Sequence, residues 1–181
     1  MFSAENDMSE TRNWSVTVAE NEFVLMKLIW LRKIIDSKPQ ISPFEKEDRN
    51  TNISGDIPLT KWSFIWGRAI EDVYLFHTKR MLIINQQQLA PELMELEHLL
   101  GVNQNDFSIW LKNQNTIVGQ EPFLSKELEN AWRAGLRLVI SLPCEEDIVQ
   151  KYNPETLILS DSVRANSTKY QETLKAFSLS D

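Results

Sequence analysis

The sequence predicts an all-α fold, a compact bundle of six or seven helices with one long loop and flexible acidic termini. Apolar residues recur at steps of three and four positions over most of the chain, which is the spacing of one helix face. The 181 residues include only 5 glycines, few for a fold that depends on tight hairpins or phosphate loops. Hydrophobic residues make up 42%, which is enough for a core and excludes a wholly disordered chain.

The N-terminal part is expected to begin with a flexible lead. Residues 1–15 are mostly polar and acidic, and terminal segments of this kind are commonly unordered. Thr17-x-x-Glu20 has the form of a capping box and predicts a first helix to about Ser37. Residues 38–60 carry prolines and a run of charges, which predicts a long loop. Such a loop is either a disordered surface segment or a functional one.

Six further helices are expected, each from an apolar stripe with a capping or stop signal at its ends. They cover residues 60–86, 91–100, 103–114, 125–142, 145–152 and 162–177. Residues 157–159 could be a strand or a buried coil, and 116–118 a short extended piece. The stripes predict a core that includes Leu28, Ile70, Val73, Leu100, Val102, Trp110, Trp132 and Leu138. The expected organisation is a lead at 1–15, a helical domain at 16–160 and a C-terminal helix and tail at 161–181.

One segment has the outline of a functional motif. Residues 93–112 predict a helix, a tight turn on Gly101 and a second helix, and in this they resemble the helix-turn-helix of phage repressors. The second helix would present polar side chains outward, and Asn and Gln are suited to reading adenine edges. The candidate nucleic-acid-binding residues are Gln104, Asn105, Ser108 and Lys112.

Two features of this segment depart from the DNA-binding pattern. Glu97 stands where the two helices should touch and where a small residue is usual. The outward face also lacks the several basic side chains that supply phosphate contacts. The segment is therefore either a DNA-binding hairpin or an αα-hairpin that packs inside the fold.

Catalytic and cofactor-binding motifs are missing from the sequence. The two histidines, His77 and His98, do not stand at metal-ligand spacing with Cys144. The acidic residues that follow Cys144 disfavour a reactive thiol. The chain has no phosphate-binding loop, nucleophile elbow or dinucleotide fingerprint. We expect no enzymatic activity, no cofactor and no metal site.

The overall charge and the aromatic residues favour a protein partner. A formal net charge of −7 disfavours nonspecific binding to nucleic acid or anionic membranes, and a basic partner surface would complement it. A single cysteine and the lack of a secretory signal or membrane span predict an intracellular protein, cytoplasmic or nuclear. Trp14 in the lead and Phe44 in the long loop are candidate partner-binding residues, although Trp14 could equally staple onto the first helix.

The expected function is that of a non-enzymatic helical protein-interaction module that binds a macromolecular partner. An adaptor, a complex subunit and an inhibitor are all compatible with the sequence. The alternative is a DNA-binding regulator that uses the helix-turn-helix-like segment at 93–112.

Overall fold

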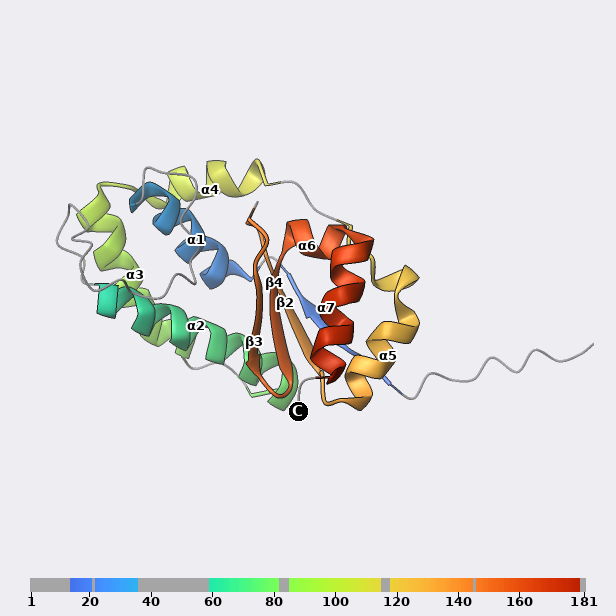
Figure 1. Ribbon diagram of the computed structural model, residues 1–181. Coiled ribbons are helices and arrows are strands. Elements are labelled where there is room, and N and C mark those ends of the chain that lie inside the picture. Colours follow the sequence, from blue (N-terminus) through green and yellow to red (C-terminus); the bar gives the residue numbers. More distant parts are fainter. Residues whose placement is uncertain are drawn as a thin grey trace, which may run out of the picture.

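A four-stranded mixed sheet lies between two layers of helices, so the prediction of an all-α helical bundle is wrong (Figure 1). The computed structural model describes residues 14–20, 22–35, 59–81, 85–114, 118–144 and 146–179. The described part of the chain contains seven α-helices in addition to this sheet. The fold is therefore a three-layer α/β/α arrangement.

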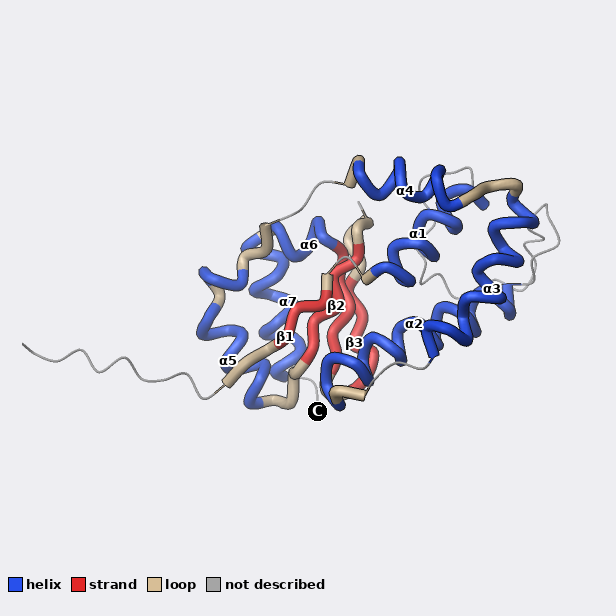
Figure 2. Tube along the Cα trace, turned by 180° about the vertical axis from the view of Figure 1, so that it is seen from behind, coloured by secondary structure: helices blue, strands red, loops and turns tan. Residues whose placement is uncertain are grey.

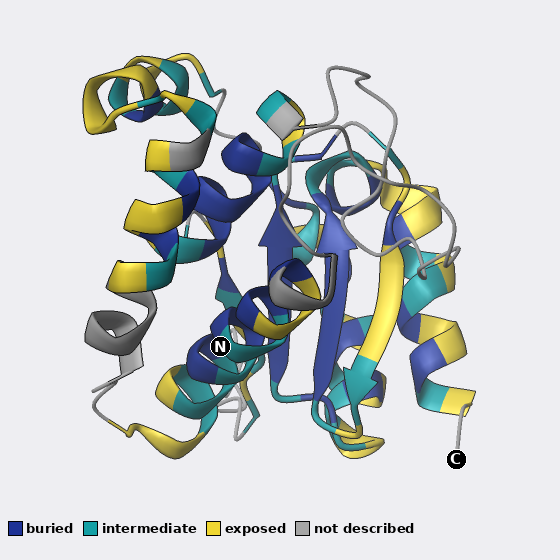
Figure 3. Cartoon of the chain, turned by 90° about the vertical axis from the view of Figure 1, so that its left-hand side faces the viewer, coloured by how far each residue is buried: buried dark blue, intermediate teal, exposed yellow. Residues whose placement is uncertain are grey.

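The sheet is built mainly from the C-terminal half of the chain. Its strands are β1 (Thr17–Ala19), β2 (Leu138–Leu142), β3 (Val149–Asn153) and β4 (Thr156–Ser160), in the order β1-β2-β4-β3. β1, β2 and β4 are parallel, and β3 pairs antiparallel with β4. Figure 3 shows the two central strands buried and the outer strand β3 exposed.

The two central strands explain why the sequence was misread as helical. Every residue of β2 and of β4 is buried, because helices cover both faces. Strands of this kind read as continuous apolar runs without alternation, and periodicity alone cannot separate them from a buried helix. The predicted helix at 125–142 is in fact α5 (Ser125–Arg133) followed by β2. Gly135, with φ of +113°, lies between them in a conformation that favours glycine.

The first helical layer contains four helices on one face of the sheet (Figures 1 and 2). They are α1 (Phe23–Ile35), α2 (Leu59–Lys79), α3 (Asn85–Leu100) and α4 (Gln104–Lys112). Their apolar stripes pack with Leu138, Ile140 and Ile158 of the sheet into one core cluster. The long helix α2 also reaches the β3–β4 hairpin, where the Tyr152 hydroxyl donates to Glu71 at 2.9 Å.

The second helical layer covers the opposite face. It consists of the short 3₁₀ helix η1 (Glu121–Phe123), α5, α6 (Asp161–Ala165) and α7 (Ser167–Leu179). Tyr170, Leu174 and Phe177 of α7 are buried against Val139 and Leu159 of the sheet in a second core cluster. The single helix predicted over 162–177 is thus two helices that meet at Asn166.

Two other predicted helices are also corrected. Thr17 lies in β1, and the first helix begins only at Phe23, so Thr17-x-x-Glu20 is not a capping box. Side chains from Trp14 to Ala19 alternate between the two sides of the sheet, which is the period of a strand. The expected helix at 145–152 is replaced by β3, which folds back on β4 through the turn after Asn153.

The predicted core residues are placed unevenly. Leu28, Ile70, Val73 and Leu138 are buried, whereas Leu100, Val102 and Trp110 are partly buried against the core. Trp132 is only half-buried, and the Arg137 guanidinium lies 4.9 Å from the centre of its ring. No helix in the described ranges is both long enough and apolar enough to cross a membrane.

Candidate protein-binding surface

The helix, turn and helix predicted at residues 93–112 are present as α3, a turn on Gly101 and α4. Gly101 has a φ of +65°, which glycine adopts without steric cost. The Asn103 side chain accepts hydrogen bonds from the backbone N–H groups of Asn105 and Asp106. The Asp106 carboxylate accepts in return from the Asn103 backbone, so that a complete capping box starts α4.

A buried lysine of α1 fastens this hairpin to the rest of the protein. Lys27 is 7% exposed, and its Nζ lies 2.9 Å from the Glu97 carboxylate. The same ammonium donates to the Gln104 side-chain oxygen at 3.1 Å and lies 6.0 Å from the centre of the Phe107 ring. Glu97, the residue that departs from the DNA-binding pattern, is therefore half of an internal ion pair. The side-chain oxygen of Gln104 is likewise occupied by a hydrogen bond from Lys27 within the fold.

The other candidate nucleic-acid-binding residues surround an apolar centre. Asn105 and Lys112 are exposed, and the Ser108 hydroxyl donates to the Gln104 carbonyl at 2.8 Å. Ile109, which is 62% exposed, lies between them on the outward face of α4. Residues 85–114 contain four carboxylates and one lysine, a formal charge of −3. This charge opposes close approach to a phosphate backbone.

Of the two candidate partner-binding aromatic residues, the structure describes Trp14 but not Phe44. Trp14 is half-buried and packs against the second core cluster, on the face of the sheet away from α1. It is therefore not a staple onto the first helix. Phe44 lies outside the described residues, as does the long loop apart from the residues that open α2.

A different segment, next to the second helical layer, displays two strongly exposed apolar side chains. We call residues 118–123 the apolar loop; it leads into α5 (Figure 2). Val118 is 78% exposed and Phe123 is 77% exposed, with the exposed Pro122 beside Phe123. The Phe123 amide donates to the Gln120 carbonyl at 2.9 Å, so this backbone has a defined turn. Leu124, directly after it, is buried in the second core cluster.

Arg164 of α6 anchors the apolar loop through Glu121. The residue is 5% exposed, and its guanidinium contacts Glu121 twice, with Nε to Oε1 at 2.6 Å and Nη2 to Oε2 at 3.4 Å. Its Nη1 reaches Glu20, just after β1, at 2.5 Å. Burial alone would lower the pKa of Arg164, but the hydrogen bonds to Glu121 and Glu20 outweigh it and raise the pKa. The guanidinium therefore stays charged and holds both carboxylates.

Gly119 permits this close packing. A Cβ built on Gly119 would lie 1.9 Å from the Glu121 carboxylate and 2.6 Å from the Arg164 guanidinium. Gly119 is buried although its neighbour Val118 is exposed. The inner side of the apolar loop is thus held by the Glu121–Arg164 ion pair and by close packing at Gly119. Its outer side exposes the apolar side chains of Val118 and Phe123.

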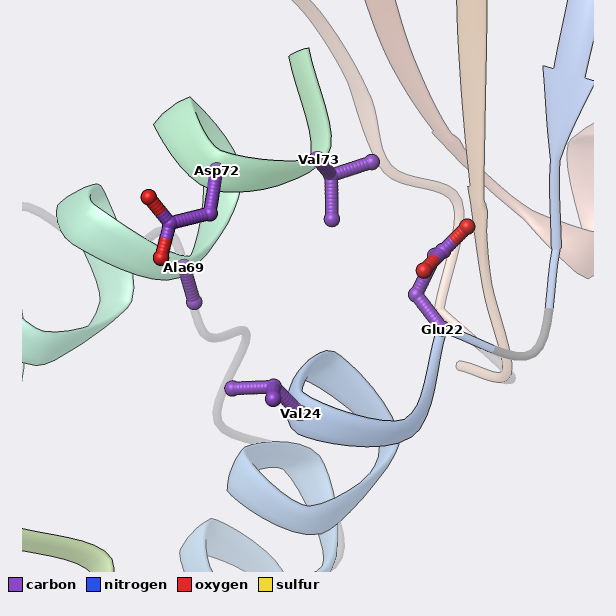
Figure 4. Close-up of a pocket in the computed structure, with 5 residues that line it drawn as sticks. All are labelled: Glu22, Val24, Ala69, Asp72 and Val73. Carbon is purple, nitrogen blue, oxygen red and sulfur yellow. The ribbon is translucent and has the colours of Figure 1, made fainter. Parts of the chain in front are cut away.

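A small pocket lies between α1 and α2 (Figure 4). It is lined by Glu22, Val24, Ala69, Asp72 and Val73 and has a cavity volume of only about 10 Å³. Small-molecule sites usually enclose roughly 300–1,000 Å³, whereas this volume has room for about one water molecule, so the pocket is too small for such a ligand. The Glu22 carboxylate lies 2.6 Å from His77 Nε2, which leaves it engaged with the protein itself.

The carboxyl ends of the parallel strands form the usual ligand-binding edge of α/β sheets. Here the polar groups bond to one another: Ser141 donates to Asp161, and the hydroxyls of Ser160 and Ser162 lie 2.9 Å apart. Burial raises the pKa of Asp161. Burial also raises the pKa of the nearby Cys144 thiol to about 12, which leaves little thiolate at neutral pH. This edge is a hydrogen-bonded structural cluster.

Metal ligation finds no support in the part of the chain that the structure describes. No group of three or more His, Cys, Asp or Glu side chains there is arranged to hold a metal ion.

The sequence reasoning missed Val118, Phe123 and their anchor Arg164. The anchor is invisible locally, because Arg164 is 43 positions from Glu121 and 144 from Glu20. The available signal was the Gly119 and Pro122 pair around Gln-Glu, which is typical of a constrained turn.

Comparisons with known proteins found no relative of this chain from which a function could be inferred. No protein family matches this chain, and no match is found among curated proteins or among solved structures.

Proposed function

We propose that this protein is a non-enzymatic interaction module, an adaptor or complex subunit, that binds another protein through the apolar loop. The observation that carries the proposal is the contrast within one short segment. Val118 and Phe123 are more than three-quarters exposed, while Glu121 between them is fixed by a buried arginine.

This contrast is what a preformed binding loop requires. Binding energy at protein interfaces is concentrated in a few large side chains that fill pockets on the partner. An aromatic group on an anchored backbone loses little conformational entropy when it binds, which improves affinity. At 77% exposure Phe123 gains little apolar burial from folding, so most of its surface remains to be buried in a complex.

Two observations argue against nucleic acid as the partner. Gln104 is committed to Lys27, and the α3–α4 hairpin carries a formal charge of −3. An acidic chain instead favours a partner with basic groups around the apolar pocket, because complementary charges accelerate encounter.

The test compares two exposed phenylalanines. The tagged full chain, Phe123→Ala and the control Phe64→Ala are used to capture proteins from native extract of the source cells, with nuclease added to half of each sample. Phe64, on α2, is 59% exposed and lies outside the apolar loop. Substitutions at such exposed positions should change stability by only about 0.5 kcal/mol.

We expect a protein that is retained by the full chain and by Phe64→Ala, with or without nuclease, and lost with Phe123→Ala. Retention by all three proteins would show that the apolar loop is not the binding site. Loss of every captured protein after nuclease treatment would support the DNA-binding alternative.

A further inference from the structure

Arg164 joins two parts of the chain that are distant in the sequence. It contacts Glu20, the residue after β1, and Glu121, in the middle of the apolar loop. Both contacts belong to one buried guanidinium. A change at either carboxylate therefore changes the charge balance felt by the other.

β1 is the least secured strand of the sheet. It has three residues and pairs on one side only, with β2 (Figure 2). The central strands have five residues each and pair on both sides. Short edge elements with few contacts open at lower free energy than the core of a fold. We therefore expect β1 to detach from the sheet before the rest of the protein unfolds.

Detachment of β1 would disturb the apolar loop at two points. It removes Glu20 from Arg164, which leaves the buried guanidinium with Glu121 alone. It also removes Trp14, Val16 and Val18 from the second core cluster, which contains Leu124 at the end of the loop. The apolar loop should become less ordered once Arg164 has lost Glu20 and Leu124 has lost part of the apolar cluster around it.

We propose that β1 and the apolar loop form one conformational device, in which docking of β1 on the sheet orders the loop through Arg164. This inference rests on the proposed function for its purpose, since an ordered loop binds with a smaller entropy cost. Its physical content is independent of any partner. A partner or a modification that pulls β1 from the sheet would switch the apolar surface off.

The test is amide hydrogen exchange of the purified full chain, followed by mass spectrometry. The amides of Phe123 and Leu124, which donate to Gln120 and Glu121, report on the loop. Glu20→Gln keeps the size of the side chain and removes its charge. Thr17→Pro removes the amide that donates to the Arg137 carbonyl at 2.9 Å and so detaches β1 directly. Glu155→Gln is the control, because it removes a carboxylate that bonds Tyr74 rather than Arg164.

We expect exchange in residues 118–124 to rise severalfold in Glu20→Gln and on the order of tenfold in Thr17→Pro, with residues 85–114 unchanged. Glu155→Gln should leave the loop at the original rate. Unchanged loop exchange in Glu20→Gln would overturn the inference, and this variant decides the matter even if Thr17→Pro does not fold. An exchange result of this kind together with failed partner capture would reject the proposed function while the coupling stands.

Discussion

Lys27 and Glu97 form an ion pair at 2.9 Å between α1 and α3, and both side chains are largely buried. Removing one member of such a pair leaves an uncompensated buried charge, which typically costs about 3–5 kcal/mol. We predict a loss of this size for Lys27→Met in urea unfolding. The double variant Lys27→Met/Glu97→Leu should recover most of it, because an apolar pair can replace a buried ion pair. Equal losses in the single and double variants would contradict this assignment.

Phe107 and Trp132 should differ in their contribution to stability. Phe107 is fully buried and contacts the rings of Phe23 and Trp30, so Phe107→Ala should cost about 3–5 kcal/mol. Trp132 is half-buried beneath Arg137, and Trp132→Ala should cost roughly 1–2 kcal/mol, of which a cation–π contact supplies about 0.5–1. Thermal or urea unfolding of the two variants gives the comparison. A larger loss at Trp132 would place its ring in the core, against the structure.

Gly119 and Gly67 provide a matched pair for the packing under the apolar loop. A Cβ at Gly119 collides with the Glu121–Arg164 ion pair, so Gly119→Ala should destabilise the protein by about 1–3 kcal/mol. A Cβ at Gly67, within α2, meets nothing within 4 Å, and Gly67→Ala should stabilise by roughly 0.5–1 kcal/mol. Both are measured by denaturant unfolding. If Gly119→Ala behaves like Gly67→Ala, the close contact is absent.

The bond between α2 and the β3–β4 turn should make stability depend on acid pH. The Tyr74 hydroxyl and then the Lys79 ammonium lower the pKa of Glu155. A carboxyl whose pKa is lowered in the folded state stabilises the protein above its ordinary pKa, and this stability is lost as the pH falls. Glu155→Gln should therefore be less stable than the original chain near neutral pH, by under about 1 kcal/mol because the side chain is partly exposed. The difference should shrink as the pH falls from neutral to below the lowered pKa of Glu155, where the carboxyl group is protonated.

A difference in stability between Glu155→Gln and the original chain that is the same at neutral and at acid pH would argue against this prediction. It would mean that the Glu155 carboxylate gains nothing from Tyr74 and Lys79 in solution.

The sequence predicted the amphipathic helices better than the sheet. α2 and α4 have apolar stripes on one side and polar residues on the other, and α4 lies close to its expected position. α2 begins where it was expected but ends at Lys79 rather than near Gln86, and α3 already begins at Asn85 rather than at Pro91. β2 and β4 are apolar on both faces, so their pattern carries no period that identifies a strand. Gly135 lies inside the helix predicted over 125–142, although its positive φ follows directly on the end of α5.

The site was harder to predict than the fold, because its anchor is made by distant residues. Glu20 was interpreted as part of a capping box, and only the folded chain shows that it binds Arg164. Gln104 looks like a base-reading residue until Lys27 is placed beside it. Such contacts depend on how the two helical layers close over the sheet, which local patterns do not encode.

The final prediction concerns duplex DNA. If residues 93–112 read bases, Asn105→Ala should weaken binding to a selected site by about 1–3 kcal/mol, and Lys112→Ala should reduce the salt dependence of binding. We expect neither effect, because residues 85–114 carry a formal charge of −3 and place Ile109 at the centre of the outward face. Titration of the purified chain with a random-duplex library, at low and at physiological salt, is the measurement. Sequence-selective enrichment that is lost in Asn105→Ala would show that the hairpin binds DNA, and the apolar loop would then have to serve a second partner.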